Sequence, residues 1–383
     1  MRISLFLICV FIVSYPLAFS DAQTITSPYE LTEIFRIGDE SKGDSIFFQD
    51  HEDLRLAVNS TNHLFVGGYG ESPVYSFSGN GEFIGFVGSE GVGPGEFNNS
   101  SNIVIGPGDS IYVYDSPTDR ISVFEPQTRR YSHGLRVTVD EGEDVYRSSA
   151  QILLGVVKDG YLFQYNTAYF PPGEPGGYDP DESRLVFVNL VNRQGRLAKK
   201  SLAELPAGER LIKTSQSRSG STISIMPLPF GRSPFFIFDN NQLYAAWNDV
   251  IDIAIMSKHG DHLRSIRVGH EALSVTRKEL ADIVAHSSKS IRKWVLESES
   301  IPKTKPAFDA LIVDDQGLIW IRKYPDTGDE LATWLIVNPT GQLEGKLDLP
   351  VGLLLKVIKK DRVYASFYDE TSGPYIVAYK IVR

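Results

Sequence analysis

The stretch GVGPGEFNNSSNIVIGPGDSIYVYDSPTDRISVFEP, residues 91–126, contains three short apolar segments separated by turn-forming residues. The segments are 103–105 (IVI), 111–114 (IYVY) and 121–124 (ISVF), and Gly, Pro, Asp and Ser dominate the positions between them. Short strands joined by such turns are typical of an antiparallel meander. One meander cannot bury both of its faces, so the pattern predicts that copies of it pack on either side.

The rest of the chain supplies these copies. Similar strand sets begin near residues 54, 91, 151, 235, 307 and 353. Six units predict an all-β, six-bladed β-propeller. The sixth unit lacks an outermost strand, whereas Glu30–Gly38 is a spare strand at the other end of the chain, so we expect this segment to complete the last blade and close the ring. The hairpin turns that precede a blade's last strand support the count: Asn80-Gly81, Gln194-Gly195, His259-Gly260 and Thr340-Gly341.

The stretch at residues 91–124 resembles an NHL-type repeat. The matching positions are Gly91, Gly93, Pro94, Gly95 and Phe97, followed by Asp115, Arg120, Ile121, Val123 and Phe124. Ser100 stands where such repeats usually carry Pro, and Thr118 stands where they usually carry Asn. The resemblance implies a six-bladed propeller of the NHL or TolB-like kind, and it transfers no active site.

The N-terminal sequence has the organisation of a secretory signal peptide, which we assign to residues 1–22. Arg2 precedes an apolar run from Ile3 to Val13, and small residues allow cleavage after Ser20 or Ala22. An uncleaved anchor is the alternative, but the run is shorter than the ~20 residues of a spanning helix. We therefore expect an exported protein, periplasmic or extracellular, whose propeller occupies residues 23–383.

Composition narrows the class of partner. Cys9 is the sole cysteine and lies within the signal peptide, so the exported chain would contain no disulfide and no catalytic thiol. The formal net charge is −10 and no basic cluster is present, which argues against nucleic-acid binding. No second apolar stretch reaches the length that a transmembrane segment needs.

Two insertions interrupt the strand rhythm. The first, Tyr169–Arg184 in the third unit, is rich in Pro, Gly, aromatic and acidic residues. The second, at about 274–306, should contain a helix that begins at a capping box of Thr276 and Glu279, with Val275 and Leu280 placed for a hydrophobic staple. Its apolar residues recur at helical spacing and should pack on a propeller face: Leu280, Ile283, Val284, Ile291, Trp294 and Val295.

Each polar cluster has a structural explanation beside the functional one. His259 and His262 could suggest a metal site, but they fall on a predicted hairpin turn. The acidic run Asp140–Asp144 could hold calcium, yet it lacks an alternating carboxylate pattern and is better explained as a solvated loop, as are the acids at 179–182. The sequence contains no Gly-x-Ser-x-Gly elbow, no P-loop and no His-Glu-x-x-His motif.

The innermost strands would line the central channel, and their first residues would meet at one mouth. Arg55, Asn102 and Asp309 occupy comparable places, with Gln151 close by, whereas two blades place Pro234 and Leu354 there. Such a polar ring predicts a ligand site, although the same residues could simply contact water in the channel.

Two functional hypotheses follow. In the first, the propeller is a binding module for a protein, peptide or glycan, without a cofactor, and its interaction surface includes Tyr169, Phe170, Tyr178 and Trp294. In the second, it is a metal-dependent lyase or lactonase-type hydrolase with a divalent cation such as calcium in the channel. The set of channel-mouth acids is small, so the sequence favours the binding module and leaves catalytic residues unassigned.

Overall fold

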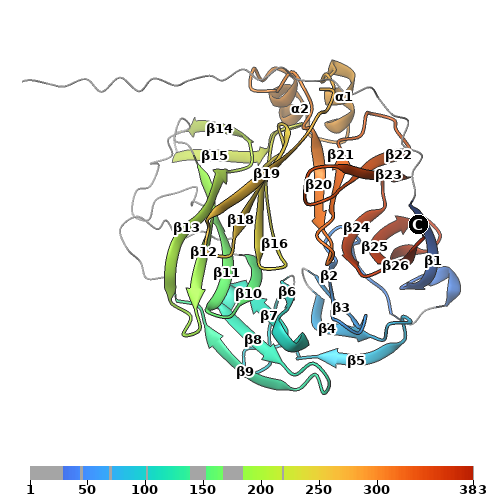
Figure 1. Cartoon of the computed structure of the whole chain (residues 1–383). Helices are drawn as coiled ribbons and strands as arrows, with labels where there is room; N and C mark the ends of the chain where they lie inside the picture. Colours follow the sequence, from blue (N-terminus) through green and yellow to red (C-terminus); the bar gives the residue numbers. More distant parts are fainter. Residues whose placement is uncertain are drawn as a thin grey trace, which may run out of the picture.

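Six four-stranded antiparallel sheets are arranged around a central channel, each forming one blade of a propeller (Figure 1). The computed structural model describes residues 29–43, 46–68, 71–100, 102–138, 152–166, 184–217 and 220–382. From the inner to the outer strand, blade 1 contains β2 (Arg55–Val58), β3 (Leu64–Gly68), β4 (Glu71–Phe77) and β5 (Phe83–Val87). Blade 2 contains β6 (Ile103–Ile105), β7 (Ile111–Asp115), β8 (Arg120–Phe124) and β9 (Tyr131–Arg136). Blade 3 contains β10 (Ile152–Val157), β11 (Gly160–Asn166), β12 (Leu185–Asn192) and β13 (Leu197–Pro206).

The second half of the chain continues the ring. Blade 4 contains β16 (Pro234–Asp239), β17 (Gln242–Trp247), β18 (Ile251–Ser257) and β19 (His262–Val268). Blade 5 contains β20 (Phe308–Val313), β21 (Ile319–Lys323), β22 (Leu331–Val337) and β23 (Leu343–Pro350). Blade 6 contains β24 (Leu354–Lys359), β25 (Arg362–Asp369), β26 (Gly373–Val382) and, outermost, β1 (Glu30–Ile37). Short 3₁₀ turns add η1 (Glu40–Lys42), η2 (Pro107–Asp109) and η3 (Ser116–Thr118).

The N-terminal strand closes the ring, as the sequence predicts. Strand β1 pairs with β26 in antiparallel register, from Glu30 opposite Val382 to Ile37 opposite Ile376. Just before β1, Tyr29 packs edge-on against Trp320 of blade 5, with ring centroids 5.9 Å apart. The chain start therefore joins the last blade and also contacts its neighbour.

Buried contacts explain the residue pattern at 91–124. Phe97 is fully buried and packs edge-on against Phe124, with ring centroids 6.2 Å apart. The guanidinium of Arg120 donates to the backbone carbonyls of Val92 and Glu96, so it fastens the glycine-rich loop to its blade. Gly95 has a φ of 77°, a conformation that favours glycine.

The four predicted hairpin turns are present. Gly81, Gly195, Gly260 and Gly341 have φ between 80° and 91°, and each donates its N–H to the carbonyl three residues earlier. The side chain that begins each turn accepts further backbone N–H groups: Ser78, Asn192, Ser257 and Asn338 respectively. Local turn chemistry thus fixes the register of the outer strands.

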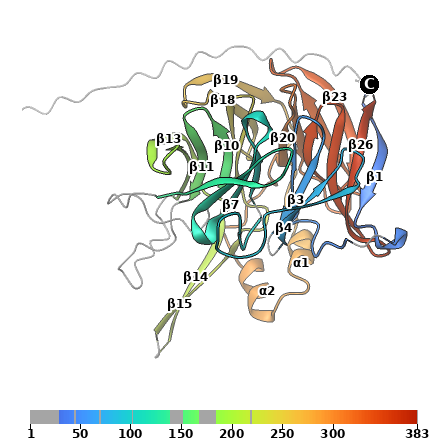
Figure 2. The same cartoon turned by 90° about the horizontal axis from the view of Figure 1, so that it is seen from below.

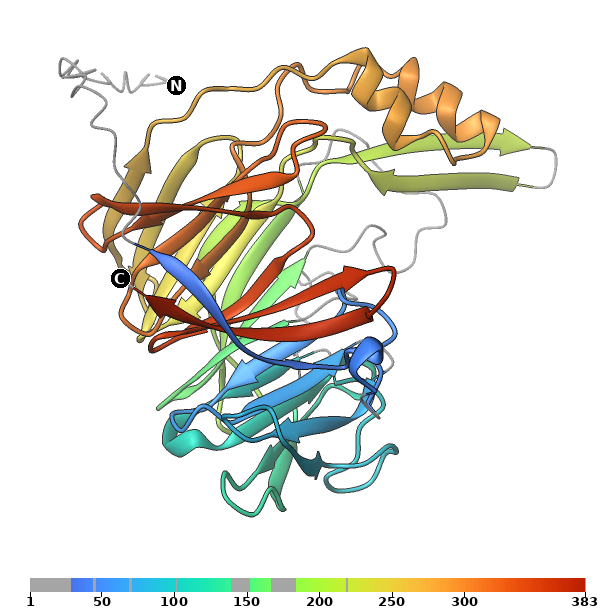
Figure 3. The ribbon, with the colours of Figure 1, turned by 90° about the vertical axis from the view of Figure 1, so that its right-hand side faces the viewer.

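Two additions project from the face of the ring where the inner strands begin (Figures 2 and 3). One is the hairpin of β14 (Arg210–Ser217) and β15 (Gly220–Pro227), which connects blades 3 and 4 and which the sequence pattern did not predict. The other contains two helices, α1 (Arg277–Ile283) and α2 (Lys289–Leu296), where a single helix was expected. The helical segment is interrupted because α1 ends at Val284 and α2 begins after its N-cap, Ser288. We call β14, β15, α1 and α2 together the platform.

The capping box at the start of α1 is confirmed. The Thr276 side chain accepts from the Glu279 N–H, and the Glu279 carboxylate accepts from the Thr276 N–H at 2.7 Å. The expected apolar stripe is only partly buried, since Leu280, Val284 and Val295 lie in the platform core while Ile283 and Ile291 are exposed. None of the helices in the described part of the chain is long and apolar enough to cross a membrane.

Candidate functional site

The six inner strands form the wall of the central channel. Each one contacts the inner strands of both neighbouring blades, in the order β2, β6, β10, β16, β20, β24 and back to β2. Because all six run in the same sense through the ring, their first residues lie at one mouth, beside the platform, and their last residues lie at the other. We call these the entry mouth and the exit mouth.

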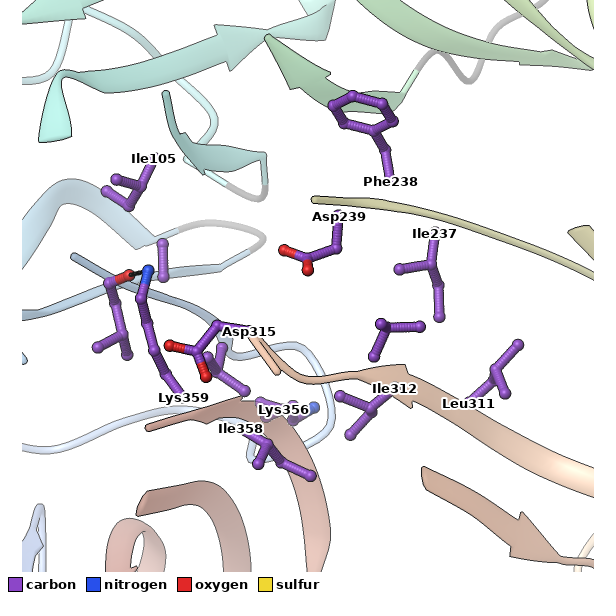
Figure 4. Close-up of a pocket in the computed structure, with 14 residues that line it drawn as sticks. Ile105, Ile237, Phe238, Asp239, Leu311, Ile312, Asp315, Lys356, Ile358 and Lys359 are labelled. Atoms are coloured by element: carbon purple, nitrogen blue, oxygen red, sulfur yellow. Dashed lines mark hydrogen bonds between the residues drawn. The ribbon is translucent and has the colours of Figure 1, made fainter. Parts of the chain in front are cut away.

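A cavity of about 300 Å³ occupies the part of the channel nearer the exit mouth (Figure 4). Its lining comes from five of the six inner strands and from the turn after β20. The apolar lining residues are Ala57, Val58, Ile105, Ile237, Phe238, Leu311, Ile312, Val313, Val357 and Ile358. The charged ones are Asp239, Asp315, Lys356 and Lys359. Most of the lining residues are apolar in type, but polar atoms make up slightly more than half of the surface that the lining exposes, so the cavity is mixed in character.

Asp239, the last residue of β16, stands out among these charged groups. Its Oδ2 atom is buried and has no hydrogen-bond partner among the residues that the structure describes. The other charged groups have partners: Lys359 Nζ donates to the Val58 carbonyl at 3.0 Å, and Asp315 Oδ1 accepts the Lys360 N–H at 2.8 Å. Figure 4 shows the Asp239 and Asp315 carboxylates extending toward the side of the cavity where Lys359 lies.

The environment of Asp239 stabilises its neutral form more than water does. Burial raises the pKa of Asp239 to about 6, and the negative charge of Asp315 adds to the increase. The positive charge of Lys359 opposes it without cancelling it. A buried acceptor with a raised pKa is a frequent property of functional sites.

At the entry mouth, the structure places three of the four channel residues proposed from sequence. Arg55 begins β2 and donates to the carbonyls of Glu52 and Leu54 at 3.0 and 3.3 Å. Asn102 directly precedes β6, and its carbonyl accepts the Tyr114 N–H at 2.9 Å. Gln151 lies outside the described residues.

Asp309, on β20, is occupied by an ion pair. Its two oxygens accept from Arg322 Nε and Nη2 at 2.6 and 2.9 Å. Burial raises the pKa of Asp309, and Arg322 reduces that increase. The Arg322 guanidinium also lies 6.0 Å from the centre of the Trp334 ring. Both oxygens of Asp309 are therefore bound by an arginine of the same blade, blade 5.

Lys356 is a channel residue that the sequence pattern did not single out. It lies at a β-bulge between Leu355 and Val357 of β24, where the pairing with β25 shifts. Its Nζ donates to the Glu52 carbonyl at 2.9 Å, toward the entry mouth. The signal in the sequence was the interruption of the apolar run 353–358 (LLLKVI) by one charged residue.

The platform has its own buried polar centre at Lys305, just before β20. Its fully buried ammonium contacts the Glu279 carboxylate, lies 2.6 Å from Asp326 Oδ1, and sits 5.7 Å from the centre of the Phe230 ring. Burial raises the pKa of Glu279, but hydrogen bonds from Lys305, Thr327 and Thr276 outweigh it and lower the pKa to about 2. These contacts tie α1 to the loops of blades 4 and 5.

The predicted interaction surface is only partly described. Trp294, on α2, is partly buried against the platform core of Leu211, Leu228, Phe230, Leu280, Val284 and Val295. Tyr169, Phe170 and Tyr178 lie outside the described residues, as do the acidic runs at 140–144 and 179–182. These four aromatic residues remain a prediction.

The histidines and acids considered for a metal site have other roles where the structure describes them. His259 lies on the predicted hairpin turn, where its N–H donates to Ser257 Oγ at 3.1 Å, and His262 Nε2 lies 3.1 Å from Ser265 Oγ. Over the described ranges, no three His, Cys, Asp or Glu side chains gather in a way that could hold a metal ion.

Comparisons with known proteins agree with this architecture. The family model of DUF5128, a 6-bladed beta-propeller, matches residues 52–168. No curated protein matches the chain. Among solved structures, a Bacteroides fragilis protein described as exported is 12% identical with a TM-score of 0.52, and the match covers 93% of this chain and 96% of that one.

Two further structures are more distant. A member of the DUF4221 family from Bacteroides vulgatus is 10% identical, with a TM-score of 0.46 and coverage of 93% and 99% of the two chains. A gluconolactonase from Xanthomonas campestris is 11% identical, with a TM-score of 0.42 and coverage of 84% and 83%. At such identities a likeness concerns the fold alone. The chain is thus a six-bladed β-propeller.

Proposed function

We propose that this protein is an exported binding module that holds a small ligand in the exit-mouth half of its channel. The observation that carries the proposal is that Asp239, whose buried Oδ2 has no partner among the described residues, lines a cavity of about 300 Å³. An unsatisfied buried acceptor destabilises a folded protein, so its presence beside a cavity supports a ligand that donates to it.

The lining indicates the class of ligand. The mixed polar and apolar lining suits a small ligand with a short hydrocarbon part, and the Asp239 carboxylate suits one hydroxyl or amine donor on it. The cavity is at the lower end of the volumes of small-molecule sites, so the ligand should be smaller than a typical drug.

Substitution of Asp239 tests the proposal even while the ligand is unidentified. The pKa of Asp239 is raised to about 6, whereas a free Asp has a pKa of about 3.9. The folded state therefore holds the proton more tightly, and its stability falls as pH rises from about 4 to about 6. Asp239→Asn removes this cost, so at pH 7 the variant should be more stable than the parent by about 3 kcal/mol, and the gain should vanish near pH 4.

The same variant should bind a cationic ligand more weakly. We would measure melting temperature with benzylamine, benzyl alcohol and toluene as probes of the cavity. The parent should respond to the amine or the alcohol more than to toluene, and Asp239→Asn, which keeps an acceptor oxygen but no negative charge, should lose the preference for the amine. Asp315→Asn is the matched control, since it removes the second cavity carboxylate charge and keeps the acceptor for Lys360. A destabilised Asp239→Asn at pH 7 would show instead that this carboxylate has a structural role.

The metal-dependent lyase or lactonase alternative requires free acids at the starts of the inner strands. Asp309 is engaged by Arg322, which does not favour this alternative. The melting experiment with EDTA and then with calcium, magnesium or zinc separates the two functions. Saturation with a metal at ~100 times its dissociation constant would add about 2.7 kcal/mol and would favour the enzyme.

A further inference from the structure

Two cationic side chains meet at one acceptor near the entry mouth. Lys356 Nζ and Arg55 Nη1 both donate to the Glu52 carbonyl, at 2.9 and 3.0 Å, so the two nitrogens lie no more than about 6 Å apart. Neither side chain forms an ion pair with a carboxylate among the described residues. A shared neutral acceptor holds like charges together without neutralising either.

Lys356 is half-buried in the channel wall. Lys356 lies at the bulge on β24, where the regular pairing with β25 is interrupted. It lines the cavity together with Ala57 of β2 and Ile312 of β20. Lys359, three residues later on the same strand, lines the same cavity but donates to the Val58 carbonyl. The two lysines therefore differ in their neighbours: Lys356 has Arg55 beside it.

Burial and this neighbour change the chemistry of the amine. Burial lowers the pKa of Lys356 to about 8, and the positive charge of Arg55 contributes, while the acids Glu52, Asp53 and Asp50 oppose the change. At pH 7.4 roughly a fifth of the Lys356 side chains would be neutral, against about a thousandth for an ordinary lysine. A desolvated lysine beside another cation is a known way to make an amine nucleophilic.

We propose that Lys356 forms an imine with small carbonyl compounds that carry an anionic group, and that Arg55 binds the anion. The neutral amine attacks the carbonyl carbon, a proton passes from nitrogen to the carbonyl oxygen, and loss of water leaves the C=N bond. The reaction consumes no oxidant or reductant. The proposal deepens the proposed function, because Lys356 lines the cavity to which the ligand was assigned.

The test uses glyoxylate as the probe on the whole exported chain. Cyanoborohydride reduces the imine to a stable carboxymethyl-lysine, which peptide mass spectrometry locates. At pH 7.4 Lys356 should be labelled about tenfold faster than the exposed lysines, with a half-maximal rate near pH 8, since the larger neutral fraction outweighs the weaker intrinsic nucleophilicity. Labelling spread evenly over the lysines would overturn the proposal.

Matched variants assign the roles. Lys356→Arg should lose the fast label, and Lys359→Arg should keep it. Arg55→Met should slow trapping of glyoxylate severalfold more than trapping of uncharged formaldehyde. Equal slowing of both probes would show that Arg55 does not bind the anion. Unchanged melting temperatures would show that the variants fold, and since Asp239→Asn is scored without any carbonyl probe, failure of the imine and failure of the cavity proposal are distinguishable.

Discussion

The propeller ring and the platform are stabilised in different ways. Between neighbouring blades the ring buries continuous apolar layers, such as the layer of blades 5 and 6 with Trp320, Trp334 and Tyr375. The platform has a core of six buried apolar residues and depends on a fully buried lysine, Lys305, with acidic partners on α1 and on the loop after β21. The ring is thus stabilised by many apolar contacts, whereas the platform depends strongly on the ion pairs of one lysine.

This difference predicts how each region responds to damage. An apolar layer loses stability in proportion to the volume removed, and all blades share the loss because the ring is closed. A buried ion pair behaves otherwise, since removing one partner leaves the other charge buried and uncompensated. The substitutions below test this contrast.

The largest effect should come from Trp320→Ala. Trp320 is fully buried, packs against Tyr29 and donates from Nε1 to Asp314 Oδ2 at 3.1 Å. The cavity and the lost hydrogen bond should lower the free energy of unfolding by about 4 kcal/mol. Denaturant unfolding measures this loss when it is followed by far-ultraviolet circular dichroism, which reports the strands and not the removed tryptophan.

A milder variant serves as the control for that result. Trp320→Phe keeps most of the buried volume and removes the hydrogen bond to Asp314, so it should cost about 1 to 2 kcal/mol. If Trp320→Ala costs no more than Trp320→Phe, the contact between Tyr29 and blade 5 does not contribute to ring closure.

Lys305→Met should produce the next largest effect, confined to the platform. The change leaves the Glu279 carboxylate buried without its cation, which should cost about 3 kcal/mol. Hydrogen exchange should accelerate in α1 and in the loop at 326–329, while the inner strands stay protected. Equal acceleration in the ring would contradict the separation of the two regions.

The double variant Glu279→Gln, Lys305→Met sharpens the test. Gln still fits a capping box at the start of α1, and no buried charge remains at that position. We expect the double variant to recover at least half of the stability that Lys305→Met loses, because replacing both charges is less costly than removing one.

The ring was predictable from sequence because its signals are local. The Asn-Gly and other Gly-containing hairpin turns, the apolar strands and the spare segment at 30–38 each report their own structure, and together they fix six blades and the closure. The capping box of Thr276 and Glu279 was readable for the same reason. Helix length was not, because Ser288 restarts the helix within an apolar pattern that continues across the break.

The hairpin of β14 and β15 and the candidate site were harder. The hairpin was missed because its alternating residues at 210–227 resemble any polar-faced strand pair, and its sequence contains only one glycine as a turn signal. Asp239 precedes Asn240 and Asn241 and so resembles a turn residue. The cavity beside it is built by strands that are distant in sequence, so it could not be predicted locally. Lys305 likewise gains its partners from residues 21 and 26 positions away.

The smallest expected effects come from two glycines at equivalent hairpin turns. Gly195 and Gly341 have φ of 80° and 91°, so an alanine at either costs about 1 kcal/mol for the left-handed backbone. Their surroundings differ: a Cβ at Gly195 would lie 2.1 Å from the Arg136 carbonyl of blade 2, whereas one at Gly341 would meet only the Ile266 side chain, at 3.7 Å.

Gly195→Ala should therefore cost about 2 kcal/mol and Gly341→Ala about 1 kcal/mol, measured as denaturant midpoints at equal m-values. The added loss at Gly195 arises because backbone atoms cannot yield as a side chain can, and because the Gly195 carbonyl also accepts the Thr138 N–H at 2.7 Å between the blades. Equal losses at the two glycines would mean that the approach of blade 3 to blade 2 is loose enough to absorb a methyl group, and the ring would then be less tightly packed at its periphery than at its buried aromatic layers.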